Sequence, residues 1–157
     1  MLIYVTGKSG SGKSAFSKQL ASVLNYKYID IDLFGHKIYE SKEVMEKLHT
    51  LFGDEIYENG IFNRKKLGQI VFSEKNSNRV QEFNKFTWDK MKELLEKEIT
   101  ENCILDYIFL PITELWLKDA IKILVKTKDE NLRINTLIKR DNITKEYALL
   151  RDKSGIE

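Results

Sequence analysis

Gly7-Lys8-Ser9-Gly10-Ser11-Gly12-Lys13-Ser14 decides the fold of this chain. The stretch follows an apolar run at residues 2–6, which is typical of a strand buried on both faces. After it, apolar residues recur at a spacing that favours one buried helical face, namely Ala15, Phe16, Leu20 and Leu24. The pattern Gly-x-x-x-x-Gly-Lys-Ser between a strand and a helix predicts a loop that binds phosphate groups.

Each residue type in this loop suits phosphate chemistry. Glycines let the backbone curl around a phosphate with its N–H groups pointing inward, and the positive end of the following helix adds to the attraction. We expect Lys13 to be an exposed loop residue that reaches the β- and γ-phosphates, and Ser14 to offer its hydroxyl to Mg²⁺. A glycine-serine turn that only caps a helix is the alternative, but it leaves the lysine unexplained. The predicted nucleotide-binding residues are Gly7, Ser9, Gly10, Ser11, Gly12, Lys13 and Ser14.

Composition indicates one folded domain. The 157 residues include one cysteine and 42% hydrophobic residues, and 26 Lys+Arg against 24 Asp+Glu leave a net charge of +2. A chain of this size can bury roughly two thirds of the surface that its unfolded form exposes. No apolar run approaches the ~20 residues of a membrane span, and the first strand follows Met1 without a charged leader. We therefore expect a cytoplasmic protein without disulfides or membrane contact, and the alternating charges of residues 93–101 predict no nucleic-acid binding.

The rest of the chain alternates strand and helix patterns. Strand patterns cover residues 26–31, 103–105 and 120–126, and the first two are followed by Asp32 and Asp106. Helical spacings cover residues 33–51 with a break near Ser41, residues 64–72, residues 80–99 with capping side chains at 76–78, and two segments after Lys128 and Thr144. Pro111 falls in an expected loop. Strands separated by helices predict a single α/β domain, in which a parallel sheet carries helices on both faces.

Two aspartates stand where the ligands of such sheets gather. Asp30 and Asp32 close the second strand pattern, and strand alternation puts both carboxylates on one side. A carboxylate there can accept the proton of an attacking hydroxyl or hold a metal through water. The alternative is that an aspartate caps the helix that follows. We favour the functional interpretation for Asp32 and leave both interpretations open for Asp30.

Three arginines near the end of the chain are further candidates. Arg133, Arg140 and Arg151 lie in residues 129–157, where six basic and six acidic side chains balance. An arginine can stabilise charge on a transferred phosphoryl group when a lid closes. A solvated helix face is the alternative for each of the three.

Four blocks of the chain, in order, resemble the dephospho-coenzyme A kinase family. After the glycine-rich loop, Asp30-Ile31-Asp32 is similar to the family's aspartate-x-aspartate. The third block is the most specific in its spacing, and it reads Gly60-Ile61-Phe62-Asn63-Arg64-Lys65-Lys66-Leu67 and ends at Val71-Phe72. The fourth block is similar to the family's lid, with Arg133 six residues before Arg140-Asp141 and with Arg151 further on.

The resemblance implies a P-loop kinase fold and transfer of the ATP γ-phosphate to the ribose 3′-hydroxyl of dephospho-coenzyme A, with Mg²⁺ bridging the phosphates. It implies that Lys13, Asp32 and Arg140 are catalytic, with Asp32 as the base, and that Ser14 binds the metal. Asp32, Arg64 and Leu67 would bind the acceptor substrate. It also implies a helical acceptor-binding insertion at about residues 33–100 and a lid at about residues 133–152.

Three positions depart from the family pattern. Thr87-Trp88 stands where most members have a His-Pro pair, and residues 106–111 follow the family's proline-leucine-leucine segment only loosely. The chain stops at Glu157, where the family has a further strand and helix. Another small-molecule or nucleoside monophosphate P-loop kinase, or a nucleotide-binding module without turnover, therefore remains the alternative. A switch GTPase is disfavoured, because the chain contains no Asn-Lys-x-Asp motif.

Overall fold

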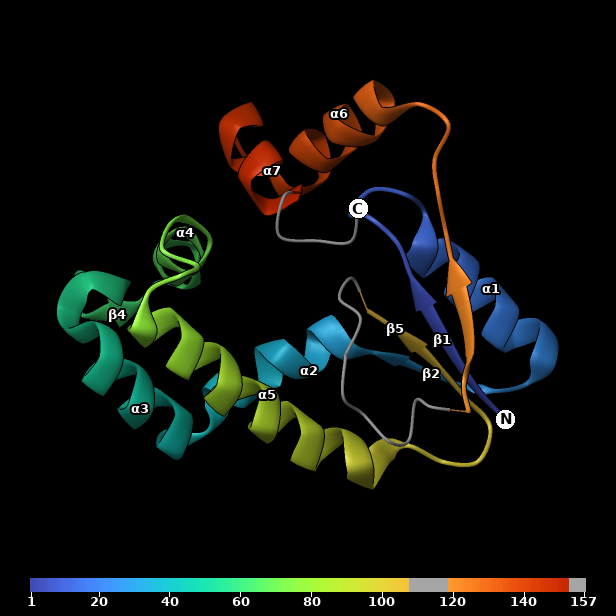
Figure 1. Ribbon diagram of the computed structural model, residues 1–157, viewed down its shortest axis with the longest axis horizontal. Helices are drawn as coiled ribbons and strands as arrows, with labels where there is room; N and C mark the ends of the chain where they lie inside the picture. The colour runs from blue at the N-terminus through green and yellow to red at the C-terminus, as the bar shows by residue number, and fades with distance from the viewer. Residues whose placement is uncertain (108–118, 153–157) are drawn as a thin grey trace. The chain divides into compact units, whose positions relative to one another are not determined.

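The structure is a computed structural model that describes residues 1–107 and 119–152. Two compact units make up the chain, the first formed by residues 1–32 and 99–157 and the second by residues 33–98. Figure 1 shows the elements of both units. Pro111 and the rest of its expected loop lie outside the described residues. No helix in the described ranges is long and apolar enough to cross a membrane.

A parallel sheet organises the first unit. Its four strands are β1 (Leu2–Thr6), β2 (Lys27–Asp30), β5 (Cys103–Asp106) and β6 (Ile121–Leu124), in the order β2-β5-β1-β6. Strand β1 is paired on both edges, so that Val5 lies beside Asp106 of β5 and beside Ile123 of β6. Because every pair is parallel, the carboxyl ends of the strands meet at one edge of the sheet.

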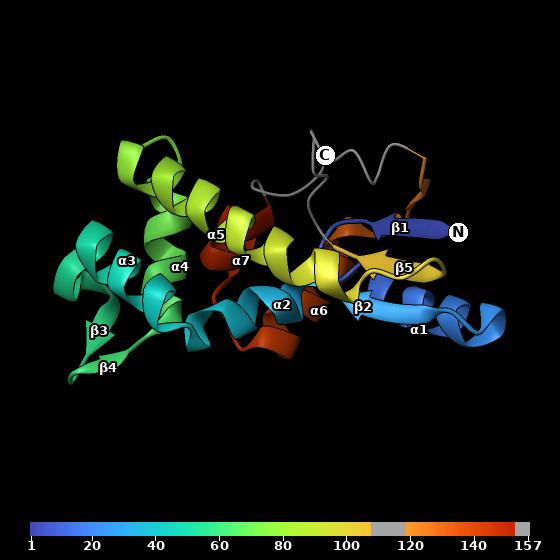
Figure 2. The ribbon, with the colours of Figure 1, turned by 90° about the horizontal axis from the view of Figure 1, so that it is seen from below.

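Helix α1 (Lys13–Leu24) covers one face of this sheet. Figure 2 shows α1 lying along that side of the strands. The core between them contains Ile3, Val5, Ala21 and Ile104. Tyr4 and Leu105 point to the other face and are fully buried as well. Burial on both faces explains the continuous apolar patterns of β1 and β5, and the expected α/β class is confirmed.

The buried side of α1 matches the predicted one only in part, because Leu20 packs against the core while the other predicted residues are exposed. Ser17 and Ala21 are buried, whereas Phe16 and Leu24 are each 39% exposed. Ser17 satisfies its hydroxyl by donating to the carbonyl oxygen of Lys13 at 2.7 Å. Small side chains let the helix lie close to the sheet, so Phe16 and Leu24 were poor guides to its buried face, whereas Leu20 was a correct one.

Helices dominate the second unit. They are most of α2 (Ile31–Lys37), α3 (Lys42–Phe52), α4 (Arg64–Ser73) and α5 (Asn78–Glu98), with 3-10 turns at Ile38–Glu40 and Gly53–Ile56. The chain breaks at Ser41, which precedes α3, as predicted. Asn63 caps α4 by accepting hydrogen bonds from two backbone N–H groups of its first turn. The hydroxyl of Ser77 accepts from the backbone N–H of Val80, so the expected capping side chain of α5 is also found.

A short antiparallel hairpin lies between α3 and α4. Its strands are β3 (Tyr57–Glu58) and β4 (Ile61–Phe62), and the turn residues Asn59 and Gly60 have φ angles of 52° and 77°. Asparagine followed by glycine with positive φ is the preferred sequence of a two-residue hairpin turn. The sequence predicted no strands here, because two residues per strand are too few to show alternation.

Helices α6 (Glu130–Asp141) and α7 (Lys145–Asp152) pack against each other in the first unit. The Asp129 side chain accepts from the backbone N–H of Leu132 at 2.9 Å, and the Thr144 hydroxyl accepts from that of Tyr147 at 3.1 Å. Both helices therefore start at side-chain caps where the sequence predicted helix starts. That the pair acts as a lid stays a prediction.

Candidate active site

The glycine-rich loop joins the carboxyl end of β1 to the start of α1. Gly12 is the N-cap of α1, and no described side chain caps the helix. The first backbone N–H groups of α1 are therefore left to bind an anion. Gly7 has no room for a side chain, because a Cβ there would lie 2.5 Å from the carbonyl oxygen of Val125. Close packing against the chain that follows β6 thus requires glycine at this position.

Lys13 is paired with a buried carboxylate. Its Nζ lies 3.1 Å from Oδ1 of Asp106, and the two side chains are 11% and 1% exposed. Asp106 ends β5 on the sheet face that α1 covers, which brings its carboxylate to the first turn of α1. The expectation of an exposed lysine is therefore wrong. Lys13 neutralises a buried charge, so it contributes to stability as well as to the charge of the site.

Tyr28 links Asp106 to the glycine-rich loop. Its hydroxyl donates to Oδ2 of Asp106 at 2.7 Å, and the Ser14 side chain hydrogen-bonds to the same hydroxyl. Burial, reinforced by the bond to Asp106, raises the pKa of Tyr28, so the hydroxyl keeps its proton at neutral pH. Because Tyr28 donates to Asp106, it accepts from Ser14. Ser14 thus spends its only proton on Tyr28 and keeps lone pairs for another partner.

The two aspartates that we predicted as a pair have different surroundings. Strand β2 ends at Asp30 and α2 begins at Ile31, so Asp32 lies in the first turn of a helix. Oδ1 of Asp30 accepts the backbone N–H of Asp32 at 3.0 Å, which makes Asp30 the helix cap. The expectation that strand alternation aligns both carboxylates is wrong, because the chain turns into a helix after Asp30.

The Asp32 carboxylate lies among charges from several elements. Burial of the carboxylate raises the pKa of Asp32 above its ordinary value. Of the nearby charges, Lys13 and Arg151 lower this pKa, whereas Asp30 and Asp106 raise it. The residue as a whole is exposed, so burial concerns the immediate surroundings of the carboxylate and a ligand can still reach it. A raised pKa makes the ionised carboxylate a stronger proton acceptor.

Two of the three candidate arginines share one carboxylate. Arg140 donates to both oxygens of Asp141, from Nε at 2.8 Å and from Nη2 at 3.1 Å. Arg151 donates from Nη1 to Oδ2 of the same Asp141 at 2.9 Å. The hydrogen bonds from both arginines lower the pKa of Asp141, and the bond from Arg140 has the larger effect. The negative charge of Asp32 also acts on Arg140, whose side chain is 55% exposed.

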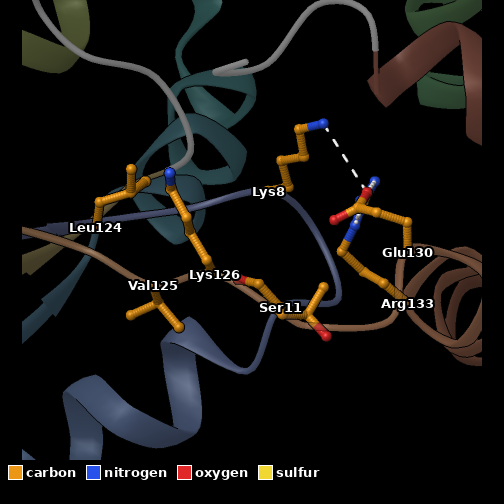
Figure 3. Close-up of a pocket in the computed structure, with 8 residues that line it drawn as sticks. Lys8, Ser11, Leu124, Val125, Lys126, Glu130 and Arg133 are labelled. Carbon is orange, nitrogen blue, oxygen red and sulfur yellow. Dashed lines mark hydrogen bonds and ion pairs between the residues drawn. The ribbon is translucent and has the colours of Figure 1, made fainter.

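Arg133 differs from the other two arginines, because its side chain is 1% exposed and fully paired. It lies beside a pocket of about 200 Å³ next to the glycine-rich loop, which Figure 3 shows. The lining includes Lys8, Ser11, Leu124, Val125, Lys126 and Arg133. A guanidinium group held in this way cannot turn toward a transferred phosphate, so the structure leaves Arg140 and Arg151 as the candidates.

The predicted acceptor residues lie in the second unit. Arg64 is exposed at the start of α4, with its guanidinium carbon 5.5 Å from the ring centre of Tyr39. Leu67, in contrast, is only 2% exposed. We predicted Leu67 as a substrate-binding residue, but a side chain so buried supports the packing of α4 and offers no surface to a ligand. Thr87, at the position of the His-Pro departure, is also buried, and its hydroxyl donates to the Phe83 carbonyl oxygen at 2.9 Å.

Sequence reasoning missed Asp106 and Tyr28 as site residues. A signal for Asp106 was present, because an acidic residue follows the strand pattern at residues 103–105 just as acidic residues close the second strand pattern. No local signal marks Tyr28. Its contact with Asp106 depends on the strand order, which places β2 beside β5.

The family model described as Dephospho-CoA kinase matches residues 1–156. A dephospho-CoA kinase from Fusobacterium nucleatum is 37% identical over 153 residues, which cover 94% of this chain and 77% of that protein. A dephospho-CoA kinase from Listeria monocytogenes is 31% identical over 164 residues, which cover 98% of this chain and 80% of that protein.

Solved structures show the same fold. The crystal structure of TT1252 from Thermus thermophilus has a TM-score of 0.76 at 25% identity and covers 99% of this chain and 80% of that one. The dephospho-CoA kinase from Campylobacter jejuni has a TM-score of 0.55 at 23% identity over 98% of this chain and 79% of that one. The family model spans nearly every residue, and the protein from Fusobacterium nucleatum is 37% identical to this chain. This chain therefore belongs to the dephospho-CoA kinase family.

Proposed function

We propose that this chain transfers the γ-phosphoryl group of ATP to the ribose 3′-hydroxyl of dephospho-coenzyme A, with Asp32 as the base. Membership of the family supports the reaction. The observation that carries the assignment is the environment of Asp32, an accessible carboxylate that caps no helix among the described residues and has a raised pKa. The positive charges of Lys13 and Arg151 stabilise the ionised Asp32 carboxylate, and the negative charge of Asp32 in turn stabilises the protonated Arg140 guanidinium.

In this reaction the acceptor oxygen forms a bond to the γ-phosphorus, and the bond from that phosphorus to the oxygen of ADP breaks. Asp32 accepts the proton of the attacking hydroxyl, for which its raised pKa is favourable. The backbone N–H groups of the loop and of the first turn of α1 bind the β-phosphate. Lys13 supplies positive charge to the β- and γ-phosphates, and its pairing with Asp106 holds the ammonium group in place beforehand.

Arg140 is the arginine that we assign to the transferred phosphoryl group. Its side chain is exposed and already within the electrostatic field of Asp32. A guanidinium can bind two phosphate oxygens at once in a planar fork. In this structure Asp141 occupies that fork with its two oxygens. A phosphoryl group with more negative charge than a carboxylate can replace it.

The oxygen atoms beside the loop fit Mg²⁺. This ion prefers oxygen ligands and is commonly bound by one or two carboxylates together with substrate phosphates. Oδ1 of Asp106 is a buried oxygen that pairs with the Lys13 ammonium at 3.1 Å but receives no well-aligned hydrogen bond from the described residues, and Ser14 keeps lone pairs to offer. The described residues contain no cluster of three or more His, Cys, Asp or Glu side chains. We propose that Ser14 and Asp106 hold Mg²⁺, which when bound neutralises charge on the phosphates.

For the acceptor we propose the second unit, residues 33–98, with Arg64 as the residue that binds an anionic group. Arg64 is exposed and held over the Tyr39 ring, so its donors remain available to a phosphate. Leu67 supports this helix from its buried side.

A cytoplasmic location, expected from the sequence, stays part of this proposal.

A coupled assay of ADP release tests the function. The full chain is incubated with ATP, Mg²⁺ and either dephospho-coenzyme A or one of several nucleoside monophosphates, with Asp32→Asn as the matched control. We expect release with dephospho-coenzyme A alone and a loss of at least the ~10²-fold typical of a missing base in the variant. Release with a monophosphate only would identify another kinase of this class. ATP binding without release with any acceptor would identify a binding module.

A further inference from the structure

Arg133 lies between the glycine-rich loop and helices α6 and α7. Its Nη1 donates to the carbonyl oxygen of Ser9 at 2.9 Å and to Oδ1 of Asp152 at 2.7 Å. Its Nη2 donates to Oδ2 of Asp152 at 2.9 Å and to Oε2 of Glu130 at 2.7 Å, and Nε donates to the same Glu130 oxygen at 3.0 Å. These bonds use every N–H donor of the guanidinium group.

The charges of this cluster balance. The Nζ atom of Lys8 lies 3.9 Å from Glu130 Oε2 and 3.9 Å from Asp152 Oδ2, so two cations face two carboxylates. Figure 3 shows Lys8 reaching toward Glu130 next to Arg133. A buried ion is stable only when its pairing is complete, and the Arg133 side chain is 1% exposed. The arrangement is therefore one fixed geometry rather than one of several surface rotamers.

The bond to Ser9 orients the loop. The carbonyl of Ser9 and the N–H of Gly10 belong to one planar trans peptide and point in opposite directions. Fixing the carbonyl on Arg133 therefore turns the Gly10 N–H away from Arg133, as a donor free for phosphate. Gly10 has φ +79°, and a Cβ there would lie 2.9 Å from the Arg133 carbonyl oxygen. The backbone of α6 thus packs directly on the loop.

The same cluster fixes the helices that carry the other two arginines. Arg133 and Arg140 are seven residues apart in α6, which is about two turns, so they lie on one face. Asp152, which Arg133 binds through both oxygens, directly follows Arg151 in α7. Anchoring Arg133 to the loop therefore sets where Arg140 and Arg151 stand relative to Lys13.

We propose that Arg133, with Glu130 and Asp152, is a positioning residue that locks the glycine-rich loop and helices α6 and α7 into one arrangement and so aims Arg140 at the phosphate. The catalytic part of this inference rests on the proposed function. The structural part, that the cluster orders the loop, does not.

Three variants of the full chain test the cluster. Arg133→Gln removes the central donor set, and Asp152→Asn is the milder variant that keeps Arg133 paired with Glu130 and Ser9. Arg79→Gln is the matched control, because Arg79 also bridges two carboxylates, Glu55 and Glu74, but does so in the second unit. The first measurement is hydrogen exchange without any ligand. We expect faster exchange of the amides of residues 7–14 in both cluster variants and no change there in Arg79→Gln.

The second measurement is turnover with ATP and dephospho-coenzyme A. We expect kcat to fall about 10- to 100-fold in Asp152→Asn, as misplaced groups cause, with the acceptor KM changed less than about threefold. In an Arg140→Ala background the same substitution should lower kcat little further, because both act through one group. Unchanged loop exchange, or a kcat loss that multiplies in full with that of Arg140→Ala, would overturn the proposal. If the unaltered protein releases no ADP with dephospho-coenzyme A, the proposed function fails, and the exchange measurement alone decides the cluster.

Discussion

Replacing Tyr28 with phenylalanine tests the contact that joins β2, β5 and the glycine-rich loop. The substitution keeps the ring and removes one hydroxyl, which donates at 2.7 Å to a carboxylate that is 1% exposed. A hydrogen bond to a charged group contributes about 1.5–3 kcal/mol, and Oδ2 of Asp106 is left buried without that donor. Ser14 is only half-buried and can turn to water, so it adds little. We expect Tyr28→Phe to lower the free energy of unfolding by about 2 kcal/mol.

Chemical and thermal unfolding measure this loss. For a chain of 157 residues, about 2 kcal/mol corresponds to a fall in Tm of about 4–8 °C. Tyr26→Phe is the matched control, because no hydrogen bond joins its hydroxyl to the described residues, and it should cost less than about 0.5 kcal/mol. In an Asp106→Ala background the cost of Tyr28→Phe should shrink, because the acceptor is gone. If Tyr28→Phe is no more destabilising than Tyr26→Phe, the reasoning about the buried carboxylate fails.

Further substitutions address the chemistry. Lys13→Ala should abolish phosphoryl transfer and also lower the free energy of unfolding by about 3 kcal/mol, because Asp106 loses its partner. Adding Asp106→Asn should restore stability but not turnover, and restored turnover would contradict the role of Lys13. Arg140→Ala should lower kcat and kcat/KM together by at least ~10²-fold, with partial recovery in Arg140→Lys, and a normal kcat with weaker ATP binding would transfer the role to Arg151. The acid limb of kcat/KM should lie above the pKa of an ordinary aspartate, because the pKa of Asp32 is raised and the base must be ionised. Because the pKa of Asp32 is higher in the folded than in the unfolded state, its contribution to stability is present at low pH and is lost as pH rises. Asp32→Asn should therefore not lower the free energy of unfolding at pH 7. A clear loss of stability at pH 7 would contradict the buried environment assigned to the Asp32 carboxylate.

Local sequence signals predicted the parts of the fold that neighbouring residues determine. The glycine-rich pattern predicted the order strand, loop and helix, and Thr144 and Asp129 mark helix starts because their side chains bond to N–H groups only a few residues away. Predictions failed where the answer depends on distant residues. The exposure of Phe16 depends on how closely α1 approaches the sheet, and the burial of Lys13 depends on the carboxylate at the end of β5, about ninety residues later in the chain.

The charged residues of segment 129–157 show that composition alone could not predict which arginines can bind a phosphate. Equal numbers of acidic and basic side chains predicted no basic patch, yet the structure places the three arginines of this segment in two different ion-pair groups. Arg133 and Lys8 are matched by Glu130 and Asp152, which leaves that cluster neutral. Arg140 and Arg151 share Asp141 as their ion-pair partner, while Asp32 acts on both through its charge. The arginines that can meet a phosphate are therefore those whose partner is shared, because an anion that binds there completes the pairing instead of breaking it.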